Sequence, residues 1–119
     1  MSPVLFEIRH NVALITLNNP AKRNMLTQEV CDLIVDAVAA AEAHPDVKAL
    51  IVTGNGKAFC AGGQLADLTP NQAVLEKIYS GFLSIANCTL PPIAAINGPA
   101  VGAGFNMAVG CDVRIVTAA

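Results

Sequence analysis

Residues 93–113, which read IAAINGPAVGAGFNMAVGCDV, constrain the fold of this chain more than any other segment. The small and β-branched residues at 93–96 predict a buried strand, and NGP at residues 97–99 predicts a turn after it. GAG at residues 102–104 then opens an apolar helical segment. The first N–H groups of a helix have no intrahelical partner and carry the positive end of its dipole. The segment therefore predicts backbone donors that a carbonyl, an oxyanion or a phosphate can approach closely.

Two nucleotide-binding alternatives use the same backbone donors, but both fail on spacing. A dinucleotide fingerprint needs G-x-G-x-x-G directly after a strand, and the glycines of residues 98–110 do not follow that order. A P-loop needs Lys and then Ser or Thr after its last glycine. Phe105 follows Gly104 instead, and Lys57 in the separate GNGK run is followed by Ala58. The spacing therefore disfavours both nucleotide sites.

A second glycine-rich segment, GKAFCAGGQL at residues 56–65, together with the first indicates what kind of ligand the backbone donors bind. The pair resembles the crotonase superfamily of enoyl-CoA hydratases and isomerases. In that family, a loop like FCAGG and a later segment like INGxxxGAG each lend one backbone N–H to an acyl-CoA thioester carbonyl. The resemblance extends to the opening hairpin at residues 4–17 and to the NML run at residues 24–26. It covers essentially the whole chain, although not the whole family domain.

The resemblance implies an α/β fold, a crotonase-like ββα spiral truncated to about its first half. We expect one partial acyl-CoA-binding domain over residues 1–119, since a chain of this length is about half a family domain. The family continues with further strands, a second catalytic carboxylate and trimerisation helices. We therefore expect uncovered apolar faces and reduced solubility of the isolated chain, and a homo-oligomer, trimer or hexamer, for a complete domain.

The predicted site follows from the same two segments. Their converging amides, without a metal ligand or nucleophile beside them, predict an oxyanion hole from the residues alone. By resemblance the two donors are the amides of Gly63 and Ala103. The other positions that resemble acyl-CoA contacts of the family are Ala61, Gln64, Leu65, Ala66 and Gly102. Gln64 departs from the family, where Asp is commonest. We expect no metal and no cofactor, because coenzyme A is part of the substrate.

Two cations precede this site in the sequence. Lys22 and Arg23 match the family loop that approaches the phosphates of coenzyme A, and a cation has an evident electrostatic purpose there. A solvated surface pair is the alternative.

Asn106 stands where the family hydratases carry the first of two catalytic glutamates. An amide does not transfer a proton, so Asn106 is expected either to orient a water or an acyl group or to bond locally within its helix. The resemblance implies an enoyl-CoA hydratase/isomerase-like protein that acts through an enolate-like intermediate in fatty-acyl-CoA metabolism. Two alternatives remain: a non-catalytic acyl-CoA-binding protein, and a structural half-domain that a partner chain completes.

Composition excludes other classes of partner. The chain has a formal net charge of −2, seven scattered basic residues, one tyrosine and no tryptophan, so it offers neither a phosphate track nor a base-stacking platform. Residues 78–111 lack charge, but prolines, asparagines and glycines break the run, which favours a buried strand, turn and helix over a membrane span. The N-terminus does not resemble a secretory signal, so the expected location is the cytoplasm.

The remaining elements follow from periodicity. We predict a hairpin from strands 4–9 and 12–17, a helix capped by Thr27 and ended by His44-Pro45, and a strand at 49–52 covered on both faces. A capping box at Thr69 predicts a second helix that Pro91-Pro92 stops. The four cysteines, which are far apart, predict reduced thiols, and Cys60 and Cys111 are expected to pack against the turns.

Overall fold

The computed structural model describes residues 2–62 and 72–117, apart from the side chains of residues 72–75 and 77. Along the chain the elements are β1 (Val4–Arg9), β2 (Val12–Leu17), the 3-10 helix η1 (Pro20–Lys22), α1 (Gln28–Ala43), β3 (Ala49–Gly54), α2 (Gln72–Ala86), β4 (Pro92–Ile96), α3 (Ala103–Val109) and β5 (Val113–Val116). This order confirms the predicted hairpin, helices and strands. The capping box predicted at Thr69 lies outside the described residues.

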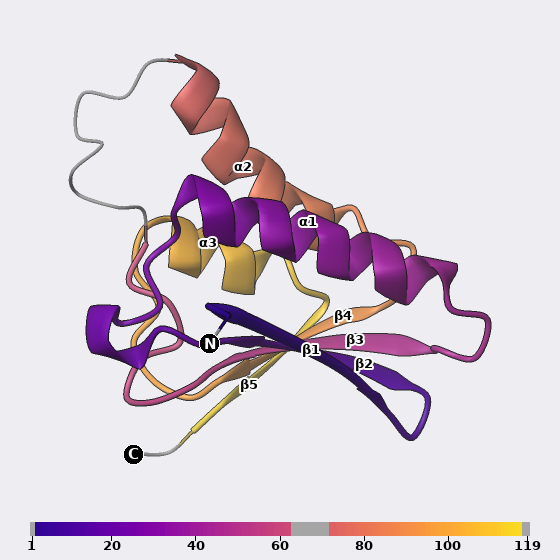
Figure 1. The fold of residues 1–119 in the computed structure, drawn as a ribbon. Coiled ribbons are helices and arrows are strands. Elements are labelled where there is room, and N and C mark those ends of the chain that lie inside the picture. The colour runs from indigo at the N-terminus through magenta and orange to yellow at the C-terminus, as the bar shows by residue number, and fades with distance from the viewer. Residues whose placement is uncertain (1, 63–71, 118–119) are drawn as a thin grey trace.

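The strands form one five-stranded sheet whose spatial order, β1-β2-β3-β4-β5, is also their order in the chain. β1 and β2 pair antiparallel, whereas the later neighbours are parallel. His10 and Asn11 join β1 to β2 with φ of 51° and 66°. Two left-handed residues in a two-residue hairpin turn match the right-handed twist of the strands. Figure 1 shows α1, α2 and α3 on the same face of this sheet.

Helix α1 begins and ends where its sequence predicts. The Val30 N–H donates to Thr27 Oγ1 at 3.1 Å, which satisfies one of the first N–H groups of the helix. His44 is extended and ends the helix before Pro45. The inward face of α1 consists of apolar residues at helical spacing, namely Val30, Cys31, Ile34, Ala37, Val38 and Ala41, all buried.

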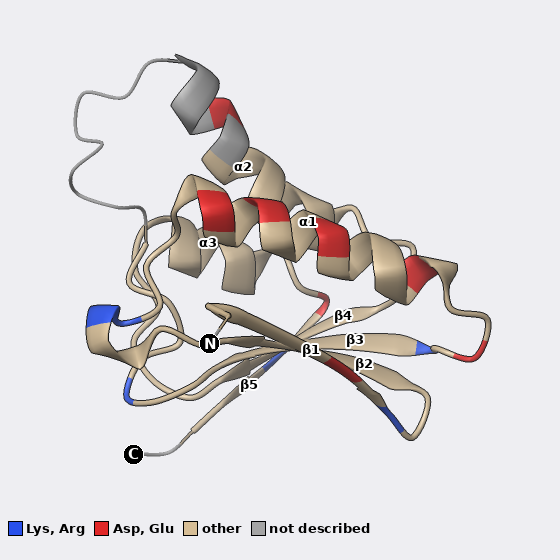
Figure 2. Ribbon diagram, viewed as in Figure 1, with Lys and Arg blue, Asp and Glu red and all other residues tan. Residues whose placement is uncertain are grey.

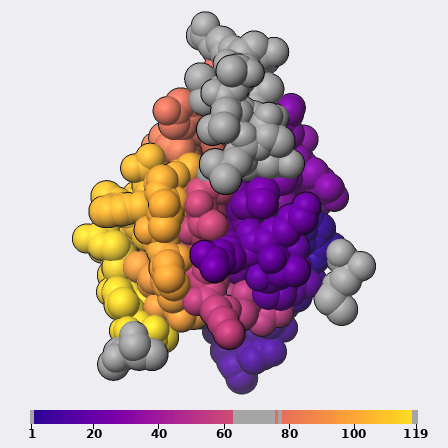
Figure 3. All heavy atoms as spheres, turned by 90° about the vertical axis from the view of Figure 1, so that its left-hand side faces the viewer, coloured from indigo at the N-terminus to yellow at the C-terminus, as the bar shows by residue number. Residues whose placement is uncertain are grey.

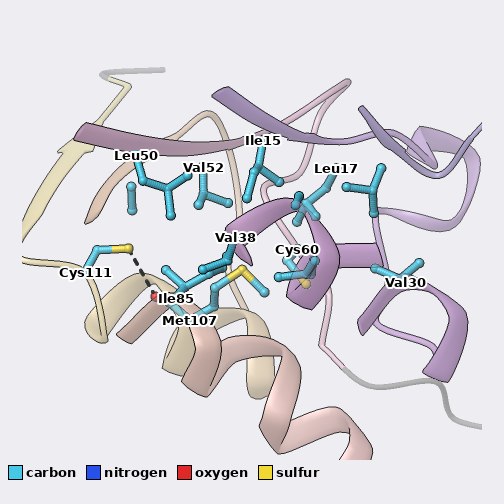
Figure 4. Close-up of a cluster of buried hydrophobic side chains, with 14 of the residues drawn as sticks. Ile15, Leu17, Val30, Val38, Leu50, Val52, Cys60, Ile85, Met107 and Cys111 are labelled. Carbon is cyan, nitrogen blue, oxygen red and sulfur yellow. Dashed lines mark hydrogen bonds between the residues drawn. The ribbon is translucent and has the colours of Figure 1, made fainter. Parts of the chain in front are cut away.

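The core lies between the helices and one face of the sheet. Alternate residues of β2 and β3 are buried, including Ile15, Leu17, Leu50 and Val52. In Figure 4 these side chains point toward Val38 of α1, Ile85 of α2 and Met107 of α3. Each of the three α-helices therefore contributes to the core. The strand at 49–52 was predicted to be covered on both faces, and this is wrong: its other residues are only half-buried, because none of the described helices packs on that side.

Helix α2 differs in detail from its prediction. Helix α2 ends at Ala86, five residues before Pro91, and the Asn87 N–H closes its last turn on the Leu83 carbonyl at 2.8 Å. Ile78 is buried, but Tyr79 is 48% exposed, so the apolar face of α2 is broader than the surface it buries.

All four residues of β5 are exposed. None of the described helices is long and apolar enough to cross a membrane.

Candidate functional site

The loops that follow β2, β3 and β4 meet at one end of the sheet. Because β2, β3 and β4 are parallel, the loops that follow them leave the sheet at the same end, which is where open α/β sheets bind ligands. Figure 3 shows the segments near residues 20, 58 and 98 side by side on one surface. Basic residues also occur at this end, on η1 and on the loop after β3, whereas acidic residues lie along α1 (Figure 2).

Backbone hydrogen bonds join the two predicted glycine-rich loops. The Val101 N–H donates to the Cys60 carbonyl at 3.0 Å, and the Phe59 N–H donates to the Pro99 carbonyl at 3.1 Å. Cys60 and Ala100 form a parallel bridge between these bonds. Segments about 40 residues apart in the sequence therefore form one short two-stranded unit beyond the main sheet.

The loop after β2 is tied to the same unit. The Ala61 N–H donates to the Arg23 carbonyl at 2.9 Å, and the Leu26 N–H donates to the Gly62 carbonyl at 2.7 Å. Ala61 and Arg23, both predicted site residues, are therefore brought together.

Gly62 lies directly beside the start of α3. Its φ is +98°, and a Cβ at this position would lie 2.8 Å from the Val101 carbonyl oxygen and 3.7 Å from the Ala103 nitrogen. Only a residue without a side chain fits so close to the second loop in this backbone conformation. The first loop thus passes next to the Ala103 amide, as the two converging segments predict.

Ala103 is the first residue of α3, and its N–H donates to no acceptor within residues 2–62 and 72–117. Its neighbours are bonded: the Gly104 N–H donates to Val101 at 2.9 Å, and the Asn106 N–H donates to Gly102 at 3.0 Å. In the described part of the chain, Ala103 therefore offers an N–H to a ligand. Four predicted site residues, Gly63, Gln64, Leu65 and Ala66, lie outside the described residues.

A cavity of about 260 Å³ opens between the three loops. It is lined by Arg23, Lys57, Ala58, Ala61, Pro99 and Val101. Arg23 lines the cavity as a predicted site residue, but Lys22 is not among its lining residues. Within the described residues, neither Arg23 nor Lys57 forms a salt bridge. The cavity thus combines an apolar lining with two cations that are available to an anion.

Sequence reasoning missed four of the cavity residues, namely Lys57, Ala58, Pro99 and Val101. In the sequence, Lys57 lies in a GNGK run that lacks the Ser or Thr of a P-loop. Its position between Gly56 and Ala58, in a turn directly after a parallel strand, is the signal that identifies it as a site cation.

Asn106 lies one turn after Ala103 on α3 and is exposed. Its side chain makes no hydrogen bond with any described residue. Residues 103 and 106 are three apart, so they share a side of the helix. The Asn106 carboxamide is therefore exposed on the same side of α3 as the Ala103 side chain.

The cysteines of the two loop segments are buried. Burial raises the pKa of the Cys60 thiol to about 11, although a hydrogen bond from the Gly62 backbone acts in the opposite direction. Burial also raises the pKa of Cys111 to about 11, and the Cys111 Sγ donates to the Met107 carbonyl at 3.5 Å. Both are protonated at neutral pH and pack as small apolar side chains, as predicted. Within residues 2–62 and 72–117, no group of His, Cys, Asp and Glu is arranged to hold a metal ion.

Comparison with known proteins gives one consistent family. The family model described as enoyl-CoA hydratase/isomerase matches residues 7–119. A protein of Mycobacterium tuberculosis named as a probable enoyl-CoA hydratase is 48% identical over 118 residues, which is 95% of this chain and 46% of the relative. An (E)-benzylidenesuccinyl-CoA hydratase of Thauera aromatica is 34% identical over 97% of this chain and 47% of its own length.

The solved structures agree with these relatives. The crystal structure of an enoyl-CoA hydratase/isomerase from Xanthobacter autotrophicus Py2 superposes with a TM-score of 0.91 at 37% identity, over 97% of this chain and 46% of that one. The chain therefore spans about half the length of the relatives that it matches.

Proposed function

The chain belongs to the enoyl-CoA hydratase/isomerase family, and from this premise we propose that its loop site binds an acyl-CoA thioester. The thioester carbonyl oxygen accepts hydrogen bonds from the backbone N–H groups of Gly63 and Ala103. The observation that carries this proposal is the Ala103 N–H, which has no acceptor among the described residues and lies beside Gly62.

A pair of backbone N–H donors suits a reaction that places negative charge on the thioester oxygen. When a proton leaves or reaches the carbon next to the carbonyl, the oxygen becomes enolate-like, and donors already in place stabilise it without reorganisation. In a protease oxyanion hole, one such donor lowers the activation barrier by about 3 kcal/mol. The proposed activity is therefore hydratase/isomerase-like chemistry through an enolate-like intermediate of a fatty acyl-CoA.

The coenzyme part of the ligand occupies the cavity between the loops. Arg23 and Lys57 line it together with apolar residues, which suits a group that carries phosphates on an organic skeleton. Lys22, the residue before Arg23, is exposed and contacts the more solvated phosphates. Ala61 and Gly102 are small, so they let the thioester arm pass between the loops.

Asn106 favours a second candidate function, a non-catalytic acyl-CoA-binding protein. Its carboxamide is exposed one helical turn after Ala103, and it can donate to a water or to the acyl group but cannot act as a general acid or base. In the catalytic proposal Asn106 orients the acyl group, and other groups move the proton. In the binding proposal no proton moves at all.

Calorimetric titration with butyryl-CoA and, separately, with free coenzyme A tests the binding site. Ala103→Pro removes one donor at the first position of a helix, where proline is well tolerated, and Ala103→Gly is the matched control that keeps the N–H. We expect Ala103→Pro to reduce the affinity for the thioester about fivefold, the value of one hydrogen bond, without changing that for free coenzyme A. Equal binding of both ligands by all three proteins would show that no oxyanion hole is present.

An assay of the same chain with crotonyl-CoA separates the two candidate functions. Loss of the conjugated enoyl thioester with time supports the catalytic proposal, and binding without loss supports the non-catalytic one.

A further inference from the structure

Asn24 is the one buried polar side chain among the described residues, with an exposed fraction of 2%. Its Oδ1 accepts from the Asn19 N–H at 2.7 Å. Its Nδ2 lies at hydrogen-bond distance from three carbonyl oxygens of the loop after β3, those of Asn55 and Ala58 at 3.0 Å and that of Phe59 at 3.3 Å.

Asn97, directly after β4, contacts the same loop. Its Nδ2 donates to the Gly56 carbonyl at 3.0 Å and to the Ala58 carbonyl at 3.1 Å. Its Oδ1 accepts from the Gly54 N–H at 3.0 Å. Ala58 is therefore held by both carboxamides, and we call Asn24 and Asn97 the carboxamide clamp.

The clamp binds the backbone on both sides of Lys57. The carbonyls of residues 55, 56, 58 and 59 all turn toward the two carboxamides. The Lys57 carbonyl packs against Gly98, where any Cβ would overlap it. The backbone on both sides of Lys57 is thus held from within the protein, while its side chain is exposed and lines the cavity.

Arg23, the other cation of the cavity, is bonded to the same assembly. It directly precedes Asn24, and both residues have left-handed backbones, with φ of 54° and 58°. Its carbonyl accepts from the Ala61 N–H at 2.9 Å. Asn24 therefore links the segment that carries Arg23 to the segment that carries Lys57.

We propose that Asn24 and Asn97 are positioning residues that hold Lys57 and Arg23 at a fixed separation, so that the cavity recognises the anionic part of coenzyme A. This inference rests on the proposed function. The clamp acts through the backbone of residues 54–59 and does not touch the ligand. Because ordering one residue costs roughly a tenfold factor in an equilibrium constant, a loosened Lys57 binds its anion about tenfold more weakly.

Calorimetry with two ligands distinguishes positioning from a general structural role. Butyryl-CoA carries the phosphates, and butyryl-pantetheine carries the same thioester without them. We expect Asn97→Ala to weaken binding of butyryl-CoA about tenfold and that of butyryl-pantetheine less than twofold. Lys57→Ala should cause the same selective loss, and Lys57→Ala with Asn97→Ala should lose no more than either variant alone.

Asn55→Ala is the matched control. It removes a carboxamide from the same loop, but that carboxamide donates to Asn18 Oδ1 at 2.9 Å on the exposed side. We expect its affinities for both ligands to be unchanged. If Asn97→Ala does not fold, Asn97→Ser, which keeps an oxygen acceptor for the Gly54 N–H, provides the same comparison.

Equal weakening of both ligands by Asn97→Ala, or additive losses with Lys57→Ala, would overturn the positioning role. If the wild-type chain binds neither ligand, the proposed function fails and the inference about recognition fails with it. Trypsin cleavage after Lys57, followed by mass spectrometry, then still reports on the clamp: it should be faster in Asn97→Ala and unchanged in Asn55→Ala.

Discussion

Replacing Asn24, the buried polar side chain of the described residues, by alanine should strongly destabilise the protein. The change removes the acceptor of the Asn19 N–H and the donor to the carbonyls of Asn55 and Phe59, while Ala58 keeps its bond from Asn97. Three lost hydrogen bonds, each with a net value of about 1 kcal/mol, give about 3 kcal/mol. The left-handed backbone at residue 24, with φ of 58°, adds about 1 kcal/mol when alanine occupies it.

Asn24→Gly separates these two contributions. Glycine loses the same hydrogen bonds but adopts the left-handed conformation without a steric cost, so we expect about 3 kcal/mol for Asn24→Gly against about 4 kcal/mol for Asn24→Ala. Asn55→Ala, which changes an exposed amide pair nearby, should cost less than about 0.5 kcal/mol.

Urea denaturation followed by circular dichroism measures the three free energies of unfolding. An Asn24→Ala variant within about 1 kcal/mol of wild type would refute the reasoning, because the carbonyls of the loop would then be satisfied without Asn24. Equal values for the glycine and alanine variants would refute only the backbone contribution.

Three further predictions concern capping and titration. Thr27→Ala should lower the free energy of unfolding by about 1 kcal/mol through loss of the α1 cap, whereas Thr27→Ser, which keeps a hydroxyl, should retain most of the wild-type stability. Equal losses for the two variants in urea denaturation would argue against the cap. The pKa of Glu42 is lowered, first by the Thr89 backbone N–H at 2.8 Å, so its ionised form stabilises the fold above about pH 4.5 and this stability is lost as the pH falls. Glu42→Gln should therefore flatten the acid side of the stability profile, and a profile identical to wild type would contradict this. Cys60 and Cys111 have raised pKa values of about 11, so the stability that they contribute is present below pH 9 and decreases as the pH rises from 9 to 11. Denaturation in urea at several alkaline pH values checks this, with Cys60→Ala and Cys111→Ala together expected to reduce the slope.

Local signals in the sequence predict the elements that depend on local physics. Thr27 marks the start of α1, and His10 with Asn11 marks the hairpin, because a cap and a two-residue turn are decided by a few neighbouring residues. The exposure of the second face of β3 was not predicted. A short run of apolar residues looks the same whether one or both of its faces are covered, so Ala49–Gly54 does not reveal its environment.

The candidate site likewise combines features that the sequence predicts with features that it does not. The approach of Gly62 to Ala103 follows from two glycine-rich segments after parallel strands, and family resemblance pairs them. The carboxamide clamp was not predicted, because its hydrogen bonds to residues 54–59 join residues 31 to 43 apart and asparagine in a turn is common for purely local reasons. For Lys57 the sequence offers one signal, its place in a turn after a strand, whereas the anchoring of that turn by Asn24 and Asn97 has no local signal.

The identity of spatial and chain order in the sheet has a consequence for biosynthesis. Each strand after β1 pairs with the strand synthesised immediately before it. During translation, each strand after β1 therefore finds a partner that is already synthesised, at the edge of a growing sheet. The chain is expected to fold vectorially on the ribosome, with the β1–β2 hairpin as its first template.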